Sequence, residues 1–301
     1  MAEKINITFL GTSQAIPTAK RNHTSILLQY KEENILVDCG EGTQRQFRKA
    51  KLNPCKLTRI LITHWHGDHI LGLAGLLQTL LLNAYNKTLY IYGPKGTKND
   101  MHELINLLVP YNKIPLKIEE ISEGKFFETK DFYLESMPMS HGIPCNAYAF
   151  VEKAKTRLDR KKIKQLKLPN SPLLGELAKG NDIEFKGKKI KAKDLIYKED
   201  ERKISFILDT SINENCHKLA KNSELIISEA VYLNAEKELA TLHEHLTASD
   251  AALIAKKANA KKLYLSHLSQ RYDGNEKLIL NEAKKKFKDV VIAEDLMQVE
   301  I

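Results

Sequence analysis

The chain has 301 residues, of which 43% are apolar, and no apolar run reaches the roughly 20 residues that a membrane-spanning helix needs. The N-terminus interleaves Glu3, Lys4 and Asn6 with apolar residues, so it lacks the apolar core of a signal peptide. We therefore expect a cytoplasmic protein that does not bind a membrane. A total of 47 Lys and Arg against 38 Asp and Glu gives a net charge of +9, which is compatible with a polyanionic partner or with a solvated lysine-rich surface.

Strands and helices are predicted to alternate along most of the chain. Short apolar runs within residues 5–38 predict a β-meander, and residues 60–63 predict a buried strand that leads through a polar loop into a helix over 70–82. Further strands with following helices are expected at 89–92 and 98–108, at 204–208 and 214–221, and, in reverse order, at 248–258 and 263–265. This pattern is typical of an α/β protein with central sheets and outer helices.

Residues 152–194 interrupt this pattern, because they hold many lysines, two prolines, three glycines and little periodicity. We therefore expect a core formed by residues 1–151 and 195–301, with 152–194 as an insertion. The insertion is basic, and its Lys161, Lys162 and Lys164 could lie on a solvated helical face or grip a phosphate backbone.

The strongest chemical signal is the run His64-Trp65-His66-Gly67-Asp68-His69, which directly follows a predicted strand. Four metal-capable side chains in one six-residue loop would form a costly polar cluster unless a cation bound them. Imidazole nitrogen and carboxylate oxygen are ligands that suit Zn²⁺. The run therefore predicts a zinc site.

Three further candidate ligands also come just after predicted strands. They are His141, Asp209 and His267, and each of them alone would be unremarkable. Ligands of catalytic sites in layered α/β folds commonly lie on loops at strand ends, so the shared placement makes one common site credible.

With these motifs in place, the chain resembles the ribonuclease Z family, the tRNA 3′-processing endonucleases of the metallo-β-lactamase superfamily. The resemblance covers nearly the whole chain. It rests on the metal loop and on four other runs: Phe9-Leu10-Gly11-Thr12-Ser13, Asp38-Cys39-Gly40-Glu41-Gly42-Thr43-Gln44, Tyr92-Gly93-Pro94-Lys95-Gly96 and His267-Leu268-Ser269-Gln270-Arg271-Tyr272. It implies a four-layer αββα sandwich of the metallo-β-lactamase type with an inserted flexible basic arm at 152–194.

The resemblance also implies two Zn²⁺ ions per chain and a set of ligands. One zinc ion would be held by His64, His66 and His141, a second by Asp68, His69 and His267, with Asp209 bridging both. Two metal ions about 3.5–4 Å apart can activate water and stabilise the attacking and leaving oxygens of an in-line displacement at phosphorus. Asp68 is similar to the family's proton acceptor.

Other site residues follow from the same resemblance. His245 occupies the position of the general acid that protonates the departing O3′, and Glu229 resembles the carboxylate that orients it and raises its pKa. Arg271 and Tyr272 could contact the scissile phosphate or stack on a base, or they could simply pack within their loop.

The insertion resembles the family's tRNA-binding arm, although it departs from the pattern at one point. Pro172 and Gly175 match the arm motif, but Ser171 stands where glycine is usual and lacks glycine's freedom for positive φ, so the local turn is expected to differ. The resemblance further implies a homodimer, in which the arm of one subunit presents tRNA to the other.

The expected function is hydrolysis of precursor tRNA next to the discriminator nucleotide, leaving a 3′-hydroxyl on the tRNA and a 5′-phosphate on the trailer. The first alternative is another two-metal hydrolase of the same fold, such as a cyclic-nucleotide or small-molecule phosphodiesterase, which would not need the basic arm. The second is an RNA-binding protein with structural zinc. Structural zinc sites are typically closed and four-coordinate, whereas seven ligands with a carboxylate bridge leave room for water.

Overall fold

The computed structural model describes residues 3–111 and 113–301. These residues form two compact units, the first comprising Met1–Phe127, Leu134–Phe150 and Lys203–Ile301 and the second Glu128–Tyr133 and Val151–Arg202. The predicted insertion at 152–194 falls within the sequence range of the second unit. The division into segments 1–151, 152–194 and 195–301 stays a prediction.

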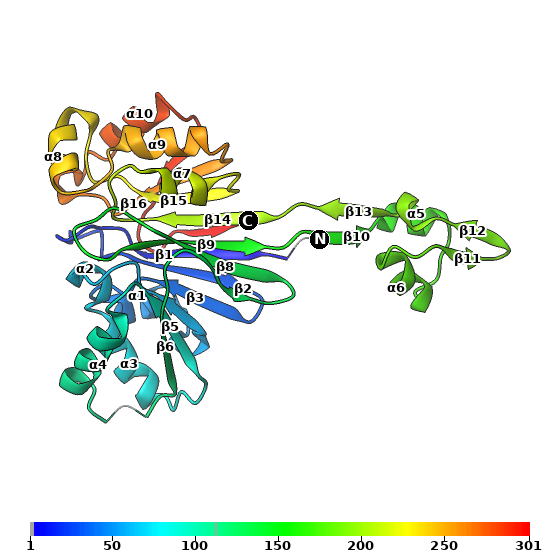
Figure 1. The fold of residues 1–301 in the computed structure, drawn as a ribbon, viewed down its shortest axis with the longest axis horizontal. Helices are drawn as coiled ribbons and strands as arrows, with labels where there is room; N and C mark the ends of the chain where they lie inside the picture. Colours follow the sequence, from blue (N-terminus) through cyan, green and yellow to red (C-terminus); the bar gives the residue numbers. More distant parts are fainter. Residues whose placement is uncertain (1–2, 112) are drawn as a thin grey trace. The chain divides into compact units, whose positions relative to one another are not determined.

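Two seven-stranded sheets form the centre of the first unit (Figure 1). In spatial order, the first sheet contains β18 (Gln298–Glu300), β1 (Ile5–Gly11), β2 (Ser25–Tyr30), β3 (Glu33–Val37), β4 (Arg59–Leu61), β5 (Leu89–Gly93) and β6 (Leu116–Glu120). The second contains β17 (Val290–Ile292), β16 (Lys262–Ser266), β15 (Leu225–Glu229), β14 (Arg202–Ile207), β9 (Asn146–Glu152), β8 (Phe132–Pro138) and β7 (Gly124–Glu128). Because β18 pairs with β1, the last strand of the chain joins the sheet that the first strand opens.

Helices cover the outer faces of both sheets (Figure 1). The first sheet carries α1 (Thr43–Lys49), α3 (Leu73–Leu82) and α4 (Thr97–Leu108), and the second carries α7 (Glu214–Ala220), α9 (Ala248–Lys257) and α10 (Lys277–Lys284). The remaining helices described in this unit are α2 (Gly67–Ile70), α8 (Lys237–Leu242) and the short 3₁₀ segments Pro54–Lys56, Asn234–Glu236 and Gln270–Tyr272. A further 3₁₀ segment, Ala192–Asp194, belongs to the second unit. The predicted αββα sandwich is confirmed. In the described part of the chain, no helix combines the length and apolarity needed to cross a bilayer.

The sequence pattern explains the layers. Strands β14, β15 and β16 pair in parallel and are almost fully buried, as expected of continuous apolar runs covered on both faces. On α3, Leu73, Leu76, Leu77 and Leu80 follow helical spacing and are fully buried in one cluster with residues of the first sheet such as Ile60. Each such side chain contributes about 1.5–3 kcal/mol of burial free energy.

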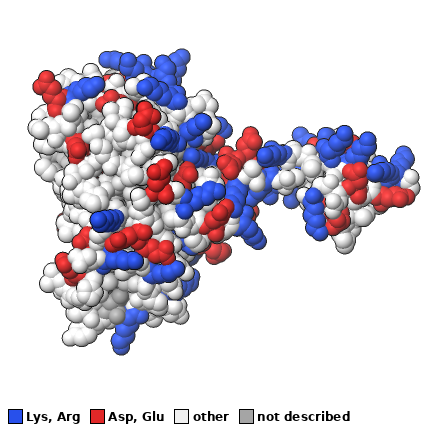
Figure 2. Space-filling view, viewed as in Figure 1, with Lys and Arg blue, Asp and Glu red and all other residues white. Residues whose placement is uncertain are grey.

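The second unit has regular structure where the sequence shows little periodicity. Its elements are β10 (Lys155–Leu158) paired with β13 (Ile196–Glu199), a hairpin of β11 (Ile183–Phe185) and β12 (Lys188–Ile190), and the helices α5 (Arg160–Gln165) and α6 (Pro172–Ala178). A small core around Leu177 and Leu195 holds these short elements together. Lysine and arginine side chains are prominent on the surface of this unit (Figure 2).

Ser171 adopts a conformation that serine tolerates. Its φ of −144° and ψ of 169° are extended values, so the residue does not need the positive φ that favours glycine. Serine therefore fits this position without backbone strain, and Pro172 begins α6 at the position where proline is well tolerated.

Candidate metal centre

The predicted metal loop lies between β4 and α2. His64 follows the strand, His66 immediately precedes α2, and Asp68 and His69 belong to this helix. Buried Asp38 fixes the loop from both sides, because its Oδ1 accepts a hydrogen bond from the Thr63 amide at 2.8 Å and its Oδ2 lies 2.7 Å from His69 Nδ1. The loop is thus anchored by a carboxylate before any metal is considered.

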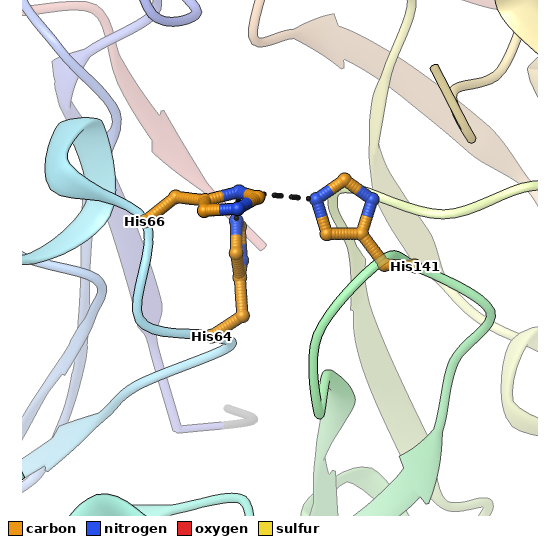
Figure 3. A group of neighbouring side chains, drawn as sticks. All are labelled: His64, His66 and His141. Atoms are coloured by element: carbon orange, nitrogen blue, oxygen red, sulfur yellow. Dashed lines mark hydrogen bonds between the residues drawn. The ribbon is translucent and has the colours of Figure 1, made fainter. Parts of the chain in front are cut away.

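A first group of ligands consists of His64, His66 and His141. Figure 3 shows the three imidazoles turned toward one another, the first two from the metal loop and the third from the segment after β8. His66 Nδ1 lies 3.0 Å from His64 Nε2 and 3.2 Å from His141 Nε2. Such a group of nitrogen atoms can hold one metal ion.

A second group consists of Asp68, His69 and His267. His69 Nε2 lies 3.1 Å from His267 Nε2, and Asp68 Oδ2 lies 3.4 Å and 3.3 Å from these two nitrogens. His69 and His267 are almost completely buried, whereas Asp68 is partly accessible. These three ligand atoms are also close enough to share one cation.

Asp209, which comes two residues after β14, faces both groups. Its Oδ2 lies 3.8 Å from His64 Nε2, and its Oδ1 lies 3.4 Å from His69 Nε2 and 3.2 Å from His267 Nε2. A carboxylate placed in this way can bridge two metal ions. The structure therefore brings all seven predicted ligands into one cluster.

The donor set fits divalent metal ions. Within the described part of the chain, Asp209 Oδ1 and His267 Nδ1 are buried without a hydrogen-bond partner, and an unsatisfied buried polar atom is costly. Burial alone would raise the pKa of Asp209, but His267 and His69 outweigh it and hold the pKa well below the usual range. An ionised carboxylate among converging imidazole nitrogens is a suitable environment for Zn²⁺.

Outer contacts orient several of these imidazoles. His64 Nδ1 lies 3.0 Å from the Thr63 hydroxyl, and His141 Nδ1 lies 3.3 Å from the main-chain oxygen of Glu244. Together with the contact between Asp38 and His69 Nδ1, these contacts engage Nδ1 of His64, His69 and His141 and leave Nε2 of each ring facing the cluster. Such partners fix the tautomer and orientation of metal-binding histidines.

His245 and Glu229 form a pair beside the cluster. Glu229, at the end of β15, is completely buried; its Oε2 lies 3.0 Å from His245 Nδ1, and its Oε1 accepts a hydrogen bond from the Thr210 amide. Burial alone would lower the pKa of His245, but Glu229 outweighs it and raises that pKa to about 9. This arrangement matches a cationic acid oriented by a carboxylate.

A cavity of about 300 Å³ opens onto the cluster. It is lined by five of the seven ligands, by His245 and by four residues to which the sequence assigned no role, Gln14, Ala15, Tyr232 and His243. Asp38 was likewise present in a recognised motif without an assigned role. Only the position of Asp38 at the end of a predicted strand could have drawn attention to it, as it did for Asp209.

The predicted substrate-binding residues lie in different surroundings. Arg271 is exposed and pairs with Glu236 at 2.9 Å, whereas the Tyr272 ring is 6% exposed and its hydroxyl contacts Glu236 and the Leu233 amide. The structure thus gives Tyr272 a packing role. The other five, Lys161, Lys162, Lys164, Pro172 and Gly175, are exposed residues of α5 and α6 in the second unit.

Comparison with known proteins extends the similarity to the whole chain. Residues 5–156, which include the metal loop, match the family model of the Anti-Pycsar protein Apyc1. Ribonuclease Z of Methanothermobacter thermautotrophicus is 38% identical over 99% of this chain and 97% of its own length. Human tRNase Z, short form, is 26% identical with a TM-score of 0.70 and 98% coverage of both chains.

A further structure supports the fold. The metallo-β-lactamase fold protein YhfI from Bacillus subtilis superposes over the full length of both chains with a TM-score of 0.73 at 20% identity. The full-length identity with ribonuclease Z exceeds what fold similarity alone requires. The chain therefore belongs to the ribonuclease Z family of the metallo-β-lactamase superfamily, and its first half also belongs to the family that the Apyc1 model describes.

Proposed function

We propose that the chain is a zinc-dependent endoribonuclease that removes the 3′ trailer from precursor tRNA. Membership of the ribonuclease Z family makes it a hydrolytic endoribonuclease. The cut lies next to the discriminator nucleotide and leaves a 3′-hydroxyl on the tRNA and a 5′-phosphate on the trailer. The observation that carries the proposal is that the seven ligands cluster beside one cavity, which five of them and His245 line, with Glu229 in contact with His245.

Two Zn²⁺ ions per chain complete this proposal. His64, His66 and His141 would hold one ion, and Asp68, His69 and His267 the other, with Asp209 shared between them. When bound, such a pair supplies activation of water at neutral pH and neutralises charge that develops on the phosphoryl group.

The side chains divide the proton transfers between them. Asp68, which lines the cavity, accepts a proton from the attacking water as the new P–O bond forms. His245 donates its proton to O3′ of the discriminator nucleotide as the P–O3′ bond breaks. Glu229 keeps His245 protonated and its ring oriented, because one carboxylate oxygen contacts the ring and the other is fixed by the Thr210 amide.

Charge supports the second unit as the tRNA-binding arm. Residues 152–194 contain 14 Lys and Arg against 6 Asp and Glu, so this segment carries eight of the nine net positive charges of the chain. Lys161, Lys162 and Lys164 on α5, with Pro172 and Gly175 on α6, would contact the tRNA backbone. Folded RNA is recognised mainly through shape and phosphates, so binding should weaken steeply with salt.

Arg271 remains a candidate contact for the scissile phosphate, since its guanidinium is exposed. The homodimer and the cytoplasmic location stay predictions.

The test compares two substrates across wild type and two variants of the enzyme. An in vitro precursor tRNA and bis(p-nitrophenyl) phosphate are incubated with wild type, His245→Ala and Asp68→Ala, and the ends of the cut RNA are mapped. The proposal predicts a cut beside the discriminator with a 3′-hydroxyl, and losses of about 10²-fold or more in both variants. If wild type hydrolysed the small phosphodiester but left precursor tRNA uncut, the result would instead favour a small-molecule phosphodiesterase.

A further inference from the structure

His243 is an exposed imidazole at the edge of the catalytic cavity to which the proposed chemistry gives no task. It follows the last residue of α8, and its amide donates to the Leu239 carbonyl at 3.0 Å. The side chain lines the same cavity as His66, Asp68 and His245. An exposed aromatic ring at this place can meet substrate without moving buried groups.

The ring of Tyr232 backs His243. The two ring centroids are 6.4 Å apart and their planes differ by only 14°, so the rings lie nearly parallel in an offset arrangement. Tyr232 is 7% exposed, and its carbonyl accepts a hydrogen bond from the Ala248 amide at 2.8 Å. A buried ring thus lies nearly parallel beside the exposed one.

Arg271 adds to the rigidity of this arrangement. Its guanidinium carbon lies 5.4 Å from the centroid of the Tyr232 ring, within the range of a cation–π contact. Glu236 holds the guanidinium in turn at 2.9 Å. A platform for a planar ligand gains affinity from being pre-organised, because less side-chain freedom is lost on binding.

We propose that His243, supported by Tyr232, stacks on the base of the discriminator nucleotide; the inference rests on the proposed function. His243 stands two residues before His245, and both line the cavity together with Tyr232. His245 donates its proton to O3′ of the discriminator nucleotide, so the base of that nucleotide should lie against the same wall. Stacking on an imidazole tolerates any base, since every base has a π-face.

Tyr272 was the aromatic residue that the sequence pointed to for such stacking. Its ring is almost fully buried and its hydroxyl is engaged by Glu236 and the Leu233 amide. Among the described cavity residues outside the ligand set, the exposed ring is that of His243. His243 is therefore better placed for stacking than Tyr272.

The experiment uses metal-loaded enzyme and precursor tRNA with 2-aminopurine, whose fluorescence is quenched by stacking, at the discriminator or at the first trailer nucleotide. Wild type, His243→Ala, His243→Gln and His243→Phe are mixed in excess with each RNA, and fluorescence is followed before cleavage. The KM and kcat for precursor tRNA are measured in parallel for each variant.

We expect quenching at the discriminator with wild type and with His243→Phe. The Ala and Gln variants should lose it and raise the KM for precursor tRNA by about tenfold or more. Absence of quenching with wild type, quenching confined to the trailer probe, or an equal loss in the Phe variant would overturn the proposal. All variants retain His245 and the ligands, so an effect confined to the variants bears on the stacking proposal alone. Failure of wild type to cut precursor tRNA would refute the proposed function itself.

Discussion

Replacing Glu229 with Gln changes one charge in a completely buried position. Glutamine has the same shape, and its oxygen can still accept the hydrogen bond of the Thr210 amide that Glu229 Oε1 accepts at 2.8 Å. Its amide nitrogen can donate to Nδ1 of a neutral His245. We therefore expect Glu229→Gln to fold, but to lose the negative charge that stabilises the protonated imidazole.

The expected size of the effect follows from the pKa of His245. Glu229 raises that pKa to about 9, against the ordinary value of 6.5, and burial alone would lower it. A general acid acts only while protonated, so its contribution is present below the pKa and is lost as the pH rises through it. At pH 8, a pKa of about 9 leaves about 90% of His245 protonated, whereas a pKa of 6.5 or below leaves at most about 3%. The loss should therefore be at least about 30-fold at pH 8 and should become smaller as the pH falls toward 6.

The assay is single-turnover cleavage of precursor tRNA between pH 6 and pH 9, with melting temperatures for each variant. The matched control is Glu224→Gln, which removes a carboxylate just before the other end of β15, where Glu224 pairs with Lys261 on the surface. The control should follow the wild-type profile. A Glu229→Gln variant with the same loss at every pH, or with no loss at pH 8, would refute the role assigned to this pair.

Three other changes probe the metal centre and the second unit. Asp209→Ala should reduce the rise in melting temperature that Zn²⁺ causes in the metal-free wild type, because binding to the folded state alone is stabilising and both ions lose a ligand; an unchanged rise in calorimetry would contradict the bridging role. Replacing Lys161, Lys162 and Lys164 with Gln should reduce the slope of log affinity for tRNA against log salt concentration by about two. An unchanged slope in filter binding would show that these lysines do not contact the tRNA. Leu177→Ala should cost about 2–5 kcal/mol within the small second core and speed amide exchange across residues 151–202; protection equal to wild type would show that this core is not what orders the unit.

Local sequence patterns were enough to predict most of the fold and the candidate metal ligands. The run from His64 to His69 concentrates four ligands between a strand and a helix, and parallel strands such as β14–β16 read as continuous apolar segments because both faces are covered. Predicted helices at 98–108 and 248–258 differ from α4 and α9 by one residue at one end each. Such signals depend on neighbours in the chain, which a single sequence contains.

Contacts between distant segments were not predictable in the same way. Asp38 anchors His69 across 31 positions, and the parallel rings of Tyr232 and His243 depend on how α8 and its following loop pack. The sequence left Tyr272 open between contact with substrate and packing within its loop, and tertiary packing buries this residue. Which face of a loop residue reaches the cavity is decided by tertiary packing rather than by spacing.

Metal titration tests the central claim most directly. Enzyme stripped of metal is given measured equivalents of Zn²⁺, and bound metal and precursor-tRNA cleavage are followed together in wild type. Because His64, His66 and His141 form one group and Asp68, His69 and His267 another, with Asp209 between them, we predict binding of about two ions per chain and full activity only near the second equivalent. Full activity at one equivalent, or in fully stripped enzyme, would contradict a two-metal centre.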